Sequence, residues 1–262
     1  MDYDDAYANS AHIPGSEAFP DLWARSAQAF RDSLGSRACL GLAYGRGDRQ
    51  AHDLFLPDAS PKGTVIFVHG GYWRASHRSD WSHLAAGSVA RGWAVAMPSY
   101  DLCPAVRISD ITVQIAGCVQ AVAADSSGPI ALAGHSAGGH LVSRMLDPCI
   151  LPAAVINRLI HVLAISPLSD LRPLMQTAMN ADFGMDLSMA EAESPRFMTD
   201  RHDVPVTVWV GGAERPVFLD QAQWLAEAWE ADHVIAPGRH HFNVIEDLTD
   251  EHSDMVRRLT PA

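Results

Sequence analysis

Ser136 lies in the segment GHSAGGH, residues 134–140, with one glycine two positions before it and another two positions after it. An apolar run typical of a strand precedes this segment, and residues with helical spacing follow it. A serine hydroxyl attacks a carbonyl group efficiently only when a base lies beside it and hydrogen-bond donors surround the reaction centre. Small neighbours leave room for the sharp strand-to-helix turn that exposes such a serine. The spacing therefore predicts a nucleophile at Ser136 rather than an idle serine in a glycine-rich turn.

The segment HGGYW, residues 69–73, could supply the hydrogen-bond donors. It follows the strand-like run TVIFV, and its two glycines allow backbone N–H groups to turn toward a ligand. An oxyanion hole of this kind combines the N–H group after the nucleophile with N–H groups from the loop after the third strand. We therefore expect the N–H groups of Gly71, Tyr72 and Ala137 to hold a developing oxyanion.

An acid and two histidines follow Ser136 in the chain, each just after a strand-like run. Glu214 follows VTVWVGG, and His240 and His241 follow HVIAPG. Serine, acid and histidine at the ends of successive strands have the chain order of a catalytic triad on a parallel sheet. Asp220 is a rival acid, but it lies within an expected helix, where a solvated helix face explains it better. The order predicts Glu214 as the acid.

These segments belong to an alternating pattern of strands and helices. From residue 63 onward, short apolar runs alternate with segments whose apolar residues are three and four positions apart, which indicates a parallel sheet covered on both faces. Two earlier runs within residues 39–57 raise the number of strands to about eight. We expect one domain over residues 1–262, with a helical N-terminal segment at 1–38 that could contribute to a lid. Residues 166–203 break the alternation and are expected to form a small cap-like insertion.

The overall charge limits the partners. The chain carries a formal net charge of -12 at pH 7 and its only lysine is Lys62, whereas nucleic acids and anionic membranes are bound by clustered Lys and Arg. No stretch approaches the length of a membrane span, and the N-terminal residues are acidic, unlike those of a signal peptide. We therefore expect a cytoplasmic protein that acts on a small molecule and binds neither nucleic acid nor membrane. The oligomeric state stays open, a homo-oligomer included.

The sequence predicts no metal site and no cofactor. His135 and His140 are five residues apart, no H-E-x-x-H motif is present, and the cysteines are scattered singly along the chain. Neither spacing is typical of metal ligands, so a metallohydrolase is disfavoured.

Three segments together, HGGYW, GHSAGGH and HHFNVIE, resemble the serine-type kynurenine formamidases (arylformamidases) and the related hormone-sensitive-lipase-like esterases of the α/β-hydrolase superfamily. The similarity extends over about residues 44–248. It implies the α/β-hydrolase fold, with Ser136 as the nucleophile and His241, rather than His240, as the base. Glu214 lies where this family usually has aspartate.

The resemblance also implies a class of substrate. Tyr72 and Trp73 replace the third glycine of the lipase-like HGGG segment, which brings the sequence closer to the formamidases. We expect Trp73, together with Phe183 of the Met-rich insertion, to bind substrate through aromatic surface. The predicted activity is hydrolysis of short-chain or aryl esters, or of N-formyl aromatic amides, through an acyl-enzyme. Two alternatives stay open: a thioesterase or peptidase that uses the same triad, and a non-catalytic binding protein with this fold.

Overall fold

Eight strands form one sheet in the computed structural model, which describes residues 2–261 of the chain. Their order across the sheet is β1-β2-β4-β3-β5-β6-β7-β8. β2 is antiparallel to both β1 and β4, and all other neighbours run parallel. The strands are β1 (Ala38–Ala43), β2 (Ala51–Phe55), β3 (Thr64–Val68), β4 (Ala94–Pro98), β5 (Ile130–His135), β6 (Leu159–Ile165), β7 (Val206–Gly211) and β8 (Asp232–Ala236). The prediction of about eight, mostly parallel strands is confirmed.

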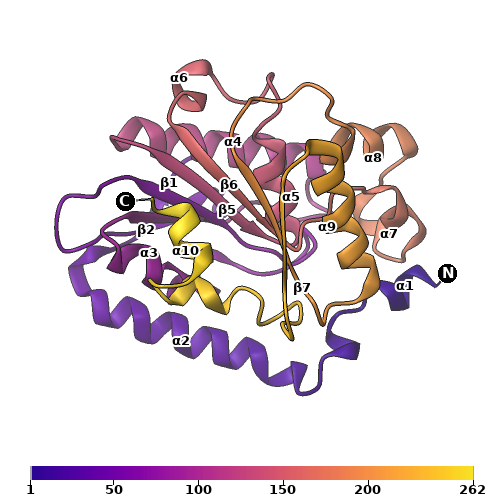
Figure 1. The fold of residues 1–262 in the computed structure, drawn as a ribbon, viewed down its shortest axis with the longest axis horizontal. Helices are drawn as coiled ribbons and strands as arrows, with labels where there is room; N and C mark the ends of the chain where they lie inside the picture. The colour runs from indigo at the N-terminus through magenta and orange to yellow at the C-terminus, as the bar shows by residue number, and fades with distance from the viewer. Residues whose placement is uncertain (1, 262) are drawn as a thin grey trace.

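Each face of the sheet has its own apolar core. In β3, Ile66 and Val68 belong to one core, whereas Val65 and Phe67 belong to the other. Successive side chains of a strand point to opposite faces, so a strand that is apolar throughout requires cover on both sides. The first face is covered by α4 (Ile108–Asp125), α5 (Ala137–Arg144) and α9 (Pro216–Trp229). The second is covered by α2 (Phe19–Leu34), α3 (Ala86–Ala90) and α10 (Asp254–Leu259), as Figure 1 shows.

The register of the sheet brings several loops to one edge. Val68, the last residue of β3, pairs with Gly134 of β5, and His135 pairs with Ile165 of β6. Parallel strands end at the same edge, so the loops after β3, β5, β6, β7 and β8 emerge side by side. These are the loops that carry the motifs singled out in the sequence.

Two segments without strands complete the structure. Between β6 and β7, residues 166–203 contain η6 (Arg172–Gln176), α7 (Asn180–Phe183), α8 (Leu187–Glu193) and η7 (Pro195–Phe197), where η denotes a 3-10 helix. Before α2, the N-terminal segment contains α1 (Tyr3–Ala6), η1 (Ser10–His12) and η2 (Ser16–Ala18). The remaining short helices are η3 (Gly35–Arg37), η4 (Arg78–Asp80), η5 (Ser82–Ala85), α6 (Ala153–Ile156) and η8 (Glu246–Thr249). None of the helices within residues 2–261 has both the length and the apolar character that a membrane span requires.

Candidate active site

Ser136 lies at the turn between β5 and α5 with φ 58° and ψ -118°, a conformation that residues with side chains rarely adopt. Close backbone packing explains the flanking glycines. A Cβ atom added to Gly134 would collide with the carbonyl oxygen of Gly138, and one added to Gly138 would collide with that of Val68. The N–H group of Ser136 donates to the carbonyl oxygen of Ile165 over 2.8 Å. The turn is therefore packed against both neighbouring strands, with Ser136 at their carboxyl edge.

Glu214 and His241 form a buried pair at the same edge. His241 Nδ1 lies 2.6 Å from Glu214 Oε2, and the two side chains are 4% and 0% exposed, respectively. Glu214 Oε1 also accepts hydrogen bonds from the N–H group of Gly211 at 2.8 Å and from Ser166 Oγ at 2.5 Å. Three donors thus compensate for the loss of water around the carboxylate. A carboxylate in this position favours the His241 tautomer with its proton on Nδ1, which leaves Nε2 able to accept a proton.

Backbone hydrogen bonds between two loops bring this pair together. The N–H groups of Gly212 and Ala213, after β7, donate to the carbonyl oxygens of Ala236 and Arg239 over 2.8 and 2.9 Å. The turn that carries Glu214 is therefore tied to the end of β8 and the loop that leads to the histidine.

The imidazole of His241 is held between two rings that the sequence did not single out for this role. The ring centroids of His135 and Phe218 lie 4.6 and 4.3 Å from that of His241. Burial lowers the pKa of His135 well below its ordinary value, so this ring stays neutral and does not repel a protonated His241. His135 directly precedes Ser136, the predicted nucleophile, and this is the one sequence signal that could have indicated its place.

The structure separates the rival residues from Ser136. Asp220 is exposed on α9, in agreement with a solvated helix face. His240 Nδ1 accepts the N–H groups of Phe242 and Asn243 at 3.2 and 3.3 Å, which gives it a structural role in its own turn. His241 lies in the cavity described next, and His240 does not line it.

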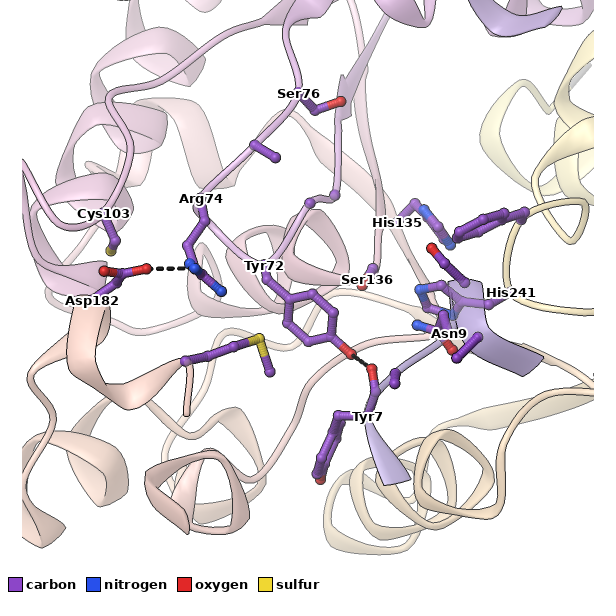
Figure 2. A pocket seen from close by; sticks show the side chains of 18 of the residues that line it. Tyr7, Asn9, Tyr72, Arg74, Ser76, Cys103, His135, Ser136, Asp182 and His241 are labelled. Carbon is purple, nitrogen blue, oxygen red and sulfur yellow. Dashed lines mark hydrogen bonds and ion pairs between the residues drawn. The ribbon is translucent and has the colours of Figure 1, made fainter. Parts of the chain in front are cut away.

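A cavity of about 900 Å³ opens at the carboxyl edge of the sheet (Figure 2). Ser136 and His241 both line it. Ser136 Oγ makes no hydrogen bond within residues 2–261, and catalytic hydrogen bonds of this kind often tighten only when substrate is bound. Further lining residues are Asp4, Tyr7, Ala8, Asn9, Ser10, Ala11, Trp23, Gly70, Gly71, Tyr72, Arg74, Ala75, Ser76, Trp81, Cys103, Pro104, His135, Met179, Asp182 and Phe242.

The loop after β3 approaches Ser136 closely. A Cβ atom added to Gly70 would lie only 3.0 Å from Ser136 Cβ. Gly71 and Tyr72 follow with φ of 105° and 51°, and the carbonyl oxygen of Gly71 accepts the N–H groups of Arg74 and Ala75 at 3.0 and 3.1 Å. This turn leaves the N–H groups of Gly71 and Tyr72 outside the backbone hydrogen bonds of the loop.

The three predicted oxyanion donors are unpaired in the part of the chain that the structure describes. There, the N–H groups of Gly71, Tyr72 and Ala137 donate to no protein acceptor, and Gly71 and Tyr72 line the cavity. Ala137 is the first residue of α5, so its N–H group has no partner within the helix. These groups are available to a ligand oxygen.

Two predicted substrate-binding residues are not on the cavity wall, which corrects that expectation. Trp73 and Phe183 are each 0% exposed, and neither lines the cavity. They pack edge to face with ring centroids 5.7 Å apart, and Trp73 also contacts the ring of His140 at 5.0 Å. The tight turn at Tyr72 and Trp73, both at positive φ, sends Tyr72 to the cavity and Trp73 into the core.

Aromatic surface reaches the cavity from other segments instead. Trp23 of α2 packs against Trp81 and Phe242, with ring centroids 4.6 and 5.3 Å away, and all three line the cavity with Tyr72. The sequence predicted a helical N-terminal segment but not which residues it would meet.

The N-terminal segment lies against the cavity and contributes Asp4, Tyr7 and residues 8–11 to its lining. Tyr72 Oη donates to the carbonyl oxygen of Tyr7 over 2.8 Å (Figure 2). Asp5 pairs with Arg215 at 2.7 Å, which ties the segment to the start of α9. The expected contribution of residues 1–38 to a lid stays a prediction.

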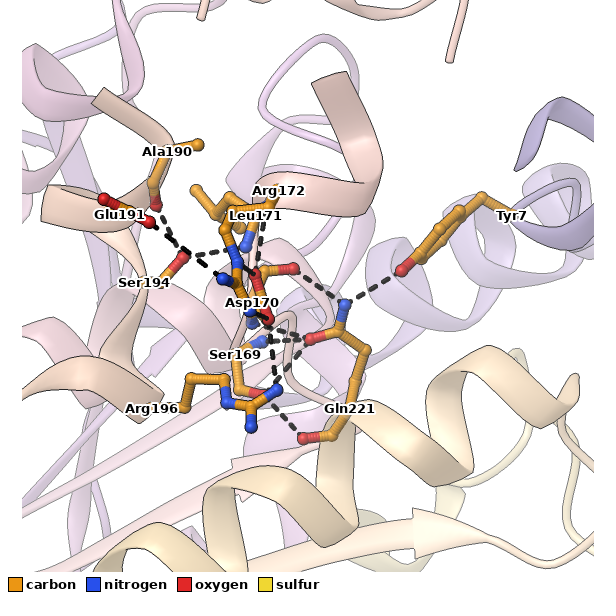
Figure 3. A network of polar contacts seen from close by, with 10 residues as sticks. All are labelled: Tyr7, Ser169, Asp170, Leu171, Arg172, Ala190, Glu191, Ser194, Arg196 and Gln221. Carbon is orange, nitrogen blue, oxygen red and sulfur yellow. Dashed lines mark hydrogen bonds and ion pairs between the residues drawn. The ribbon is translucent and has the colours of Figure 1, made fainter. Parts of the chain in front are cut away.

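A buried polar network anchors Tyr7 from the other side (Figure 3). Gln221 Nε2 donates to Tyr7 Oη at 2.9 Å and to the carbonyl oxygen of Asp170 at 2.8 Å. Gln221 Oε1 accepts the N–H groups of Ser169 and Asp170, both at 2.7 Å. Both amide hydrogens and the amide oxygen of this buried glutamine therefore have partners. The network joins the N-terminal segment, α9 and the beginning of residues 166–203.

The residues that the structure describes contain no group of three or more His, Cys, Asp and Glu side chains able to hold a metal ion. His140 is fully buried, and its Nε2 lies 2.7 Å from the carbonyl oxygen of Glu193. Burial lowers its pKa to about 3. Its role is therefore structural.

Known proteins resemble this chain in both sequence and structure. Kynurenine formamidases from Salmo salar and Drosophila melanogaster are 26% and 28% identical to it, over 82% and 83% of this chain and 78% and 79% of their own lengths. A protein from Silicibacter sp. TM1040, provisionally named a thioesterase, has a known crystal structure and is 62% identical to this chain in sequence. The two structures match with a TM-score of 0.98 over 99% of each chain. The resemblance of the motifs to the formamidases is thereby confirmed. The α/β-hydrolase fold family matches residues 65–241, which is more than half of the chain and includes Ser136, Glu214 and His241, and the chain therefore belongs to this family.

Proposed function

We propose that this α/β-hydrolase is a serine hydrolase in which Ser136, Glu214 and His241 act as a triad. The observation that carries the proposal is the buried Glu214–His241 pair, 2.6 Å apart, at a cavity that Ser136 also lines. A histidine oriented by a carboxylate is the base that a serine hydroxyl requires.

The reaction has two steps. Ser136 Oγ attacks the substrate carbonyl carbon while His241 Nε2 takes the hydroxyl proton. The tetrahedral intermediate then collapses as His241 returns the proton to the leaving oxygen or nitrogen, and the acyl group stays on Ser136. A water molecule, deprotonated by His241, attacks the acyl-enzyme; the bond to Ser136 Oγ then breaks, His241 returns the proton to Oγ, and the carboxylic acid is released. Glu214 stabilises the imidazolium that forms in each step.

We assign the oxyanion site to the N–H groups of Gly71, Tyr72 and Ala137. The available N–H groups and the close approach of Gly70 to Ser136 support this assignment. Each donor of this kind contributes on the order of 3 kcal/mol to the stability of the transition state.

The substrate class we infer is short-chain or aryl carboxylic esters and N-formyl aromatic amides. Aromatic side chains of Trp23, Tyr72, Trp81 and Phe242 line the cavity, and such surface suits a flat ring. The names of the Salmo salar and Drosophila melanogaster relatives, kynurenine formamidases, support an N-formyl amide as the substrate.

The test of the triad is covalent labelling by a fluorophosphonate probe, which reacts with activated serines. We expect stoichiometric labelling of the native protein at Ser136 and none in Ser136→Ala. Ser76→Ala is the matched control, because Ser76 also lines the cavity with a hydroxyl group, and this variant should be labelled like the native protein. Labelling that persists in Ser136→Ala would contradict the proposal.

A thioesterase is the second candidate, favoured by the name of the Silicibacter relative. The charges on the cavity wall argue against a polyanionic leaving group such as coenzyme A, because Asp4 and Asp182 outnumber the one guanidinium, Arg74. The net charge of -12 adds to the repulsion. We expect kcat/KM for acetyl-coenzyme A to be at least about tenfold below that for phenyl acetate. The opposite order would favour the thioesterase.

A further inference from the structure

Arg74 and Asp182 place opposite charges on the wall of the cavity. Arg74 Nη2 lies 2.6 Å from Asp182 Oδ2, and the side chains are 39% and 31% exposed, respectively. Arg74 follows the turn that carries the oxyanion donors, whereas Asp182 belongs to α7 in the segment between β6 and β7. Figure 2 shows the ion pair on one side of the Tyr72 ring and Ser136 on the other. Two segments far apart in the sequence thus meet at the cavity through a charged contact.

Both side chains of this pair keep polar atoms that are free to bind a further partner. Within residues 2–261, each is the only charged partner of the other, so the guanidinium keeps an unpaired edge and the carboxylate keeps Oδ1. The Arg78–Asp53 pair differs, because its side chains are only 14% and 5% exposed and Asp53 Oδ1 also accepts the N–H group of Gly41. A half-exposed ion pair stabilises a fold by less than about 1 kcal/mol. A contribution to the stability of the fold therefore does not explain why Arg74 and Asp182 lie at the cavity.

The surroundings of the pair favour a ligand with both charges. Cys103 lies beside Asp182 in Figure 2, and Met179 and Pro104 add further apolar surface to the cavity lining. A ligand with only a negative group would also meet the carboxylates of Asp4 and Asp182. A ligand with a carboxylate and an ammonium group can give both Arg74 and Asp182 a partner of opposite charge.

We propose that Arg74 and Asp182 form a subsite for the zwitterionic head group of an aromatic α-amino acid. Arg74 binds the α-carboxylate and Asp182 binds the α-ammonium group, while the aromatic ring lies against Tyr72 and the scissile bond faces Ser136. The inference rests on the proposed function and narrows its substrate class to N-acyl arylamines or aryl esters whose leaving group carries an amino-acid head. Formylkynurenine has this chemistry.

Equilibrium binding measured by titration calorimetry tests the subsite without requiring catalysis. The probes are L-kynurenine, which carries the head group, and 2-aminoacetophenone, which has the same aryl ketone without it. We expect L-kynurenine to bind the native protein at least about tenfold more tightly. Arg74→Gln and Asp182→Asn should each reduce this affinity ratio by about tenfold, because each removes one charge-assisted contact. Arg257→Gln, which removes an exposed ion pair with Asp254 on α10, should leave the ratio unchanged.

The outcomes separate this inference from the proposed function. Equal affinity of the native protein for both probes would overturn the subsite, and so would a loss of affinity in the two variants that is the same for both probes. The expected ratios would support the subsite even if formylkynurenine were not hydrolysed, in which case only the formamidase activity would be discarded. Because the assay compares two ligands of one variant, a partly unfolded preparation changes the amount of binding and not the ratio.

Discussion

Glu214 is one methylene longer than the aspartate usual at this position, and its hydrogen bonds explain how the extra length is accommodated. The side chain folds back over its own turn, so that Oε1 accepts the N–H group of Gly211 while Oε2 reaches His241. Ser166, at φ 46° directly after β6, donates to the same Oε1. The orientation of the carboxylate is therefore set by the ends of two strands. In the proposed triad, Ser166 is a positioning residue that acts through Glu214.

At the residue scale, Glu214→Gln should lower kcat for phenyl acetate by about 10³ to 10⁴-fold. An amide nitrogen can donate to His241, which favours the wrong tautomer of the imidazole. Steady-state kinetics on the two variants Glu214→Gln and Asp220→Asn check this, because Asp220 is exposed on α9 and should be dispensable. The reverse ranking of the two variants would assign the acid to Asp220.

At the scale of elements, α5 packs so closely against β3 that only glycine fits at the contact. Gly138→Ala would place a methyl group against the carbonyl oxygen of Val68. We expect this variant to lose about 1–3 kcal/mol of unfolding free energy and to react more slowly with the fluorophosphonate, because Ser136 lies two residues away.

Gly117→Ala is the matched control for this element. Gly117 lies in α4, and a Cβ atom added there meets no atom within 4 Å. Alanine has the higher helix propensity, so this variant should gain up to about 1 kcal/mol in urea unfolding. Equal stability changes in the two variants would contradict the packing argument.

At the scale of the whole molecule, buried histidines make the stability of the fold depend on pH, because their side chains are neutral in the folded state. Burial lowers the pKa of both His69 and His140 to about 3. An unfolded chain binds protons at these histidines below about pH 6.5, whereas the folded chain does not until the pH approaches these lowered values. The unfolded state therefore binds more protons in this interval, and the free energy of unfolding falls as the pH falls.

We expect each of these histidines to reduce the free energy of unfolding by up to about 2 kcal/mol between pH 7 and pH 5. Urea unfolding across this range measures the effect. The free energy of unfolding of His140→Gln should change less with pH than that of the native protein, by up to about 1.4 kcal/mol per pH unit. His252→Gln is the control, because the side chain of His252 is 76% exposed, and its dependence should match that of the native protein. A common slope for all three proteins would show that these buried histidines do not govern the acid sensitivity.

Features that depend on local geometry could be predicted from the sequence alone. The order of strands and helices follows from residue periodicity, and the turn at Ser136 follows from the need for small residues at positions 134 and 138. The positions of Glu214 and His241 were predictable for a related reason, because successive parallel strands end at one edge of the sheet.

The identity of the side chains that line the cavity could not be predicted from the sequence. Trp73 and Phe183 were expected there, yet both are buried. The direction of the Trp73 side chain depends on how its tight turn packs, and Phe183, at the end of α7, packs against the Trp73 ring. The N-terminal segment and the Arg74–Asp182 pair lie at the cavity through contacts between residues far apart in the chain. Ser166 joins Glu214 across 48 positions in the same way. Periodicity and motifs describe neighbours along the chain, whereas these contacts depend on the packing of loops and helices around the finished sheet.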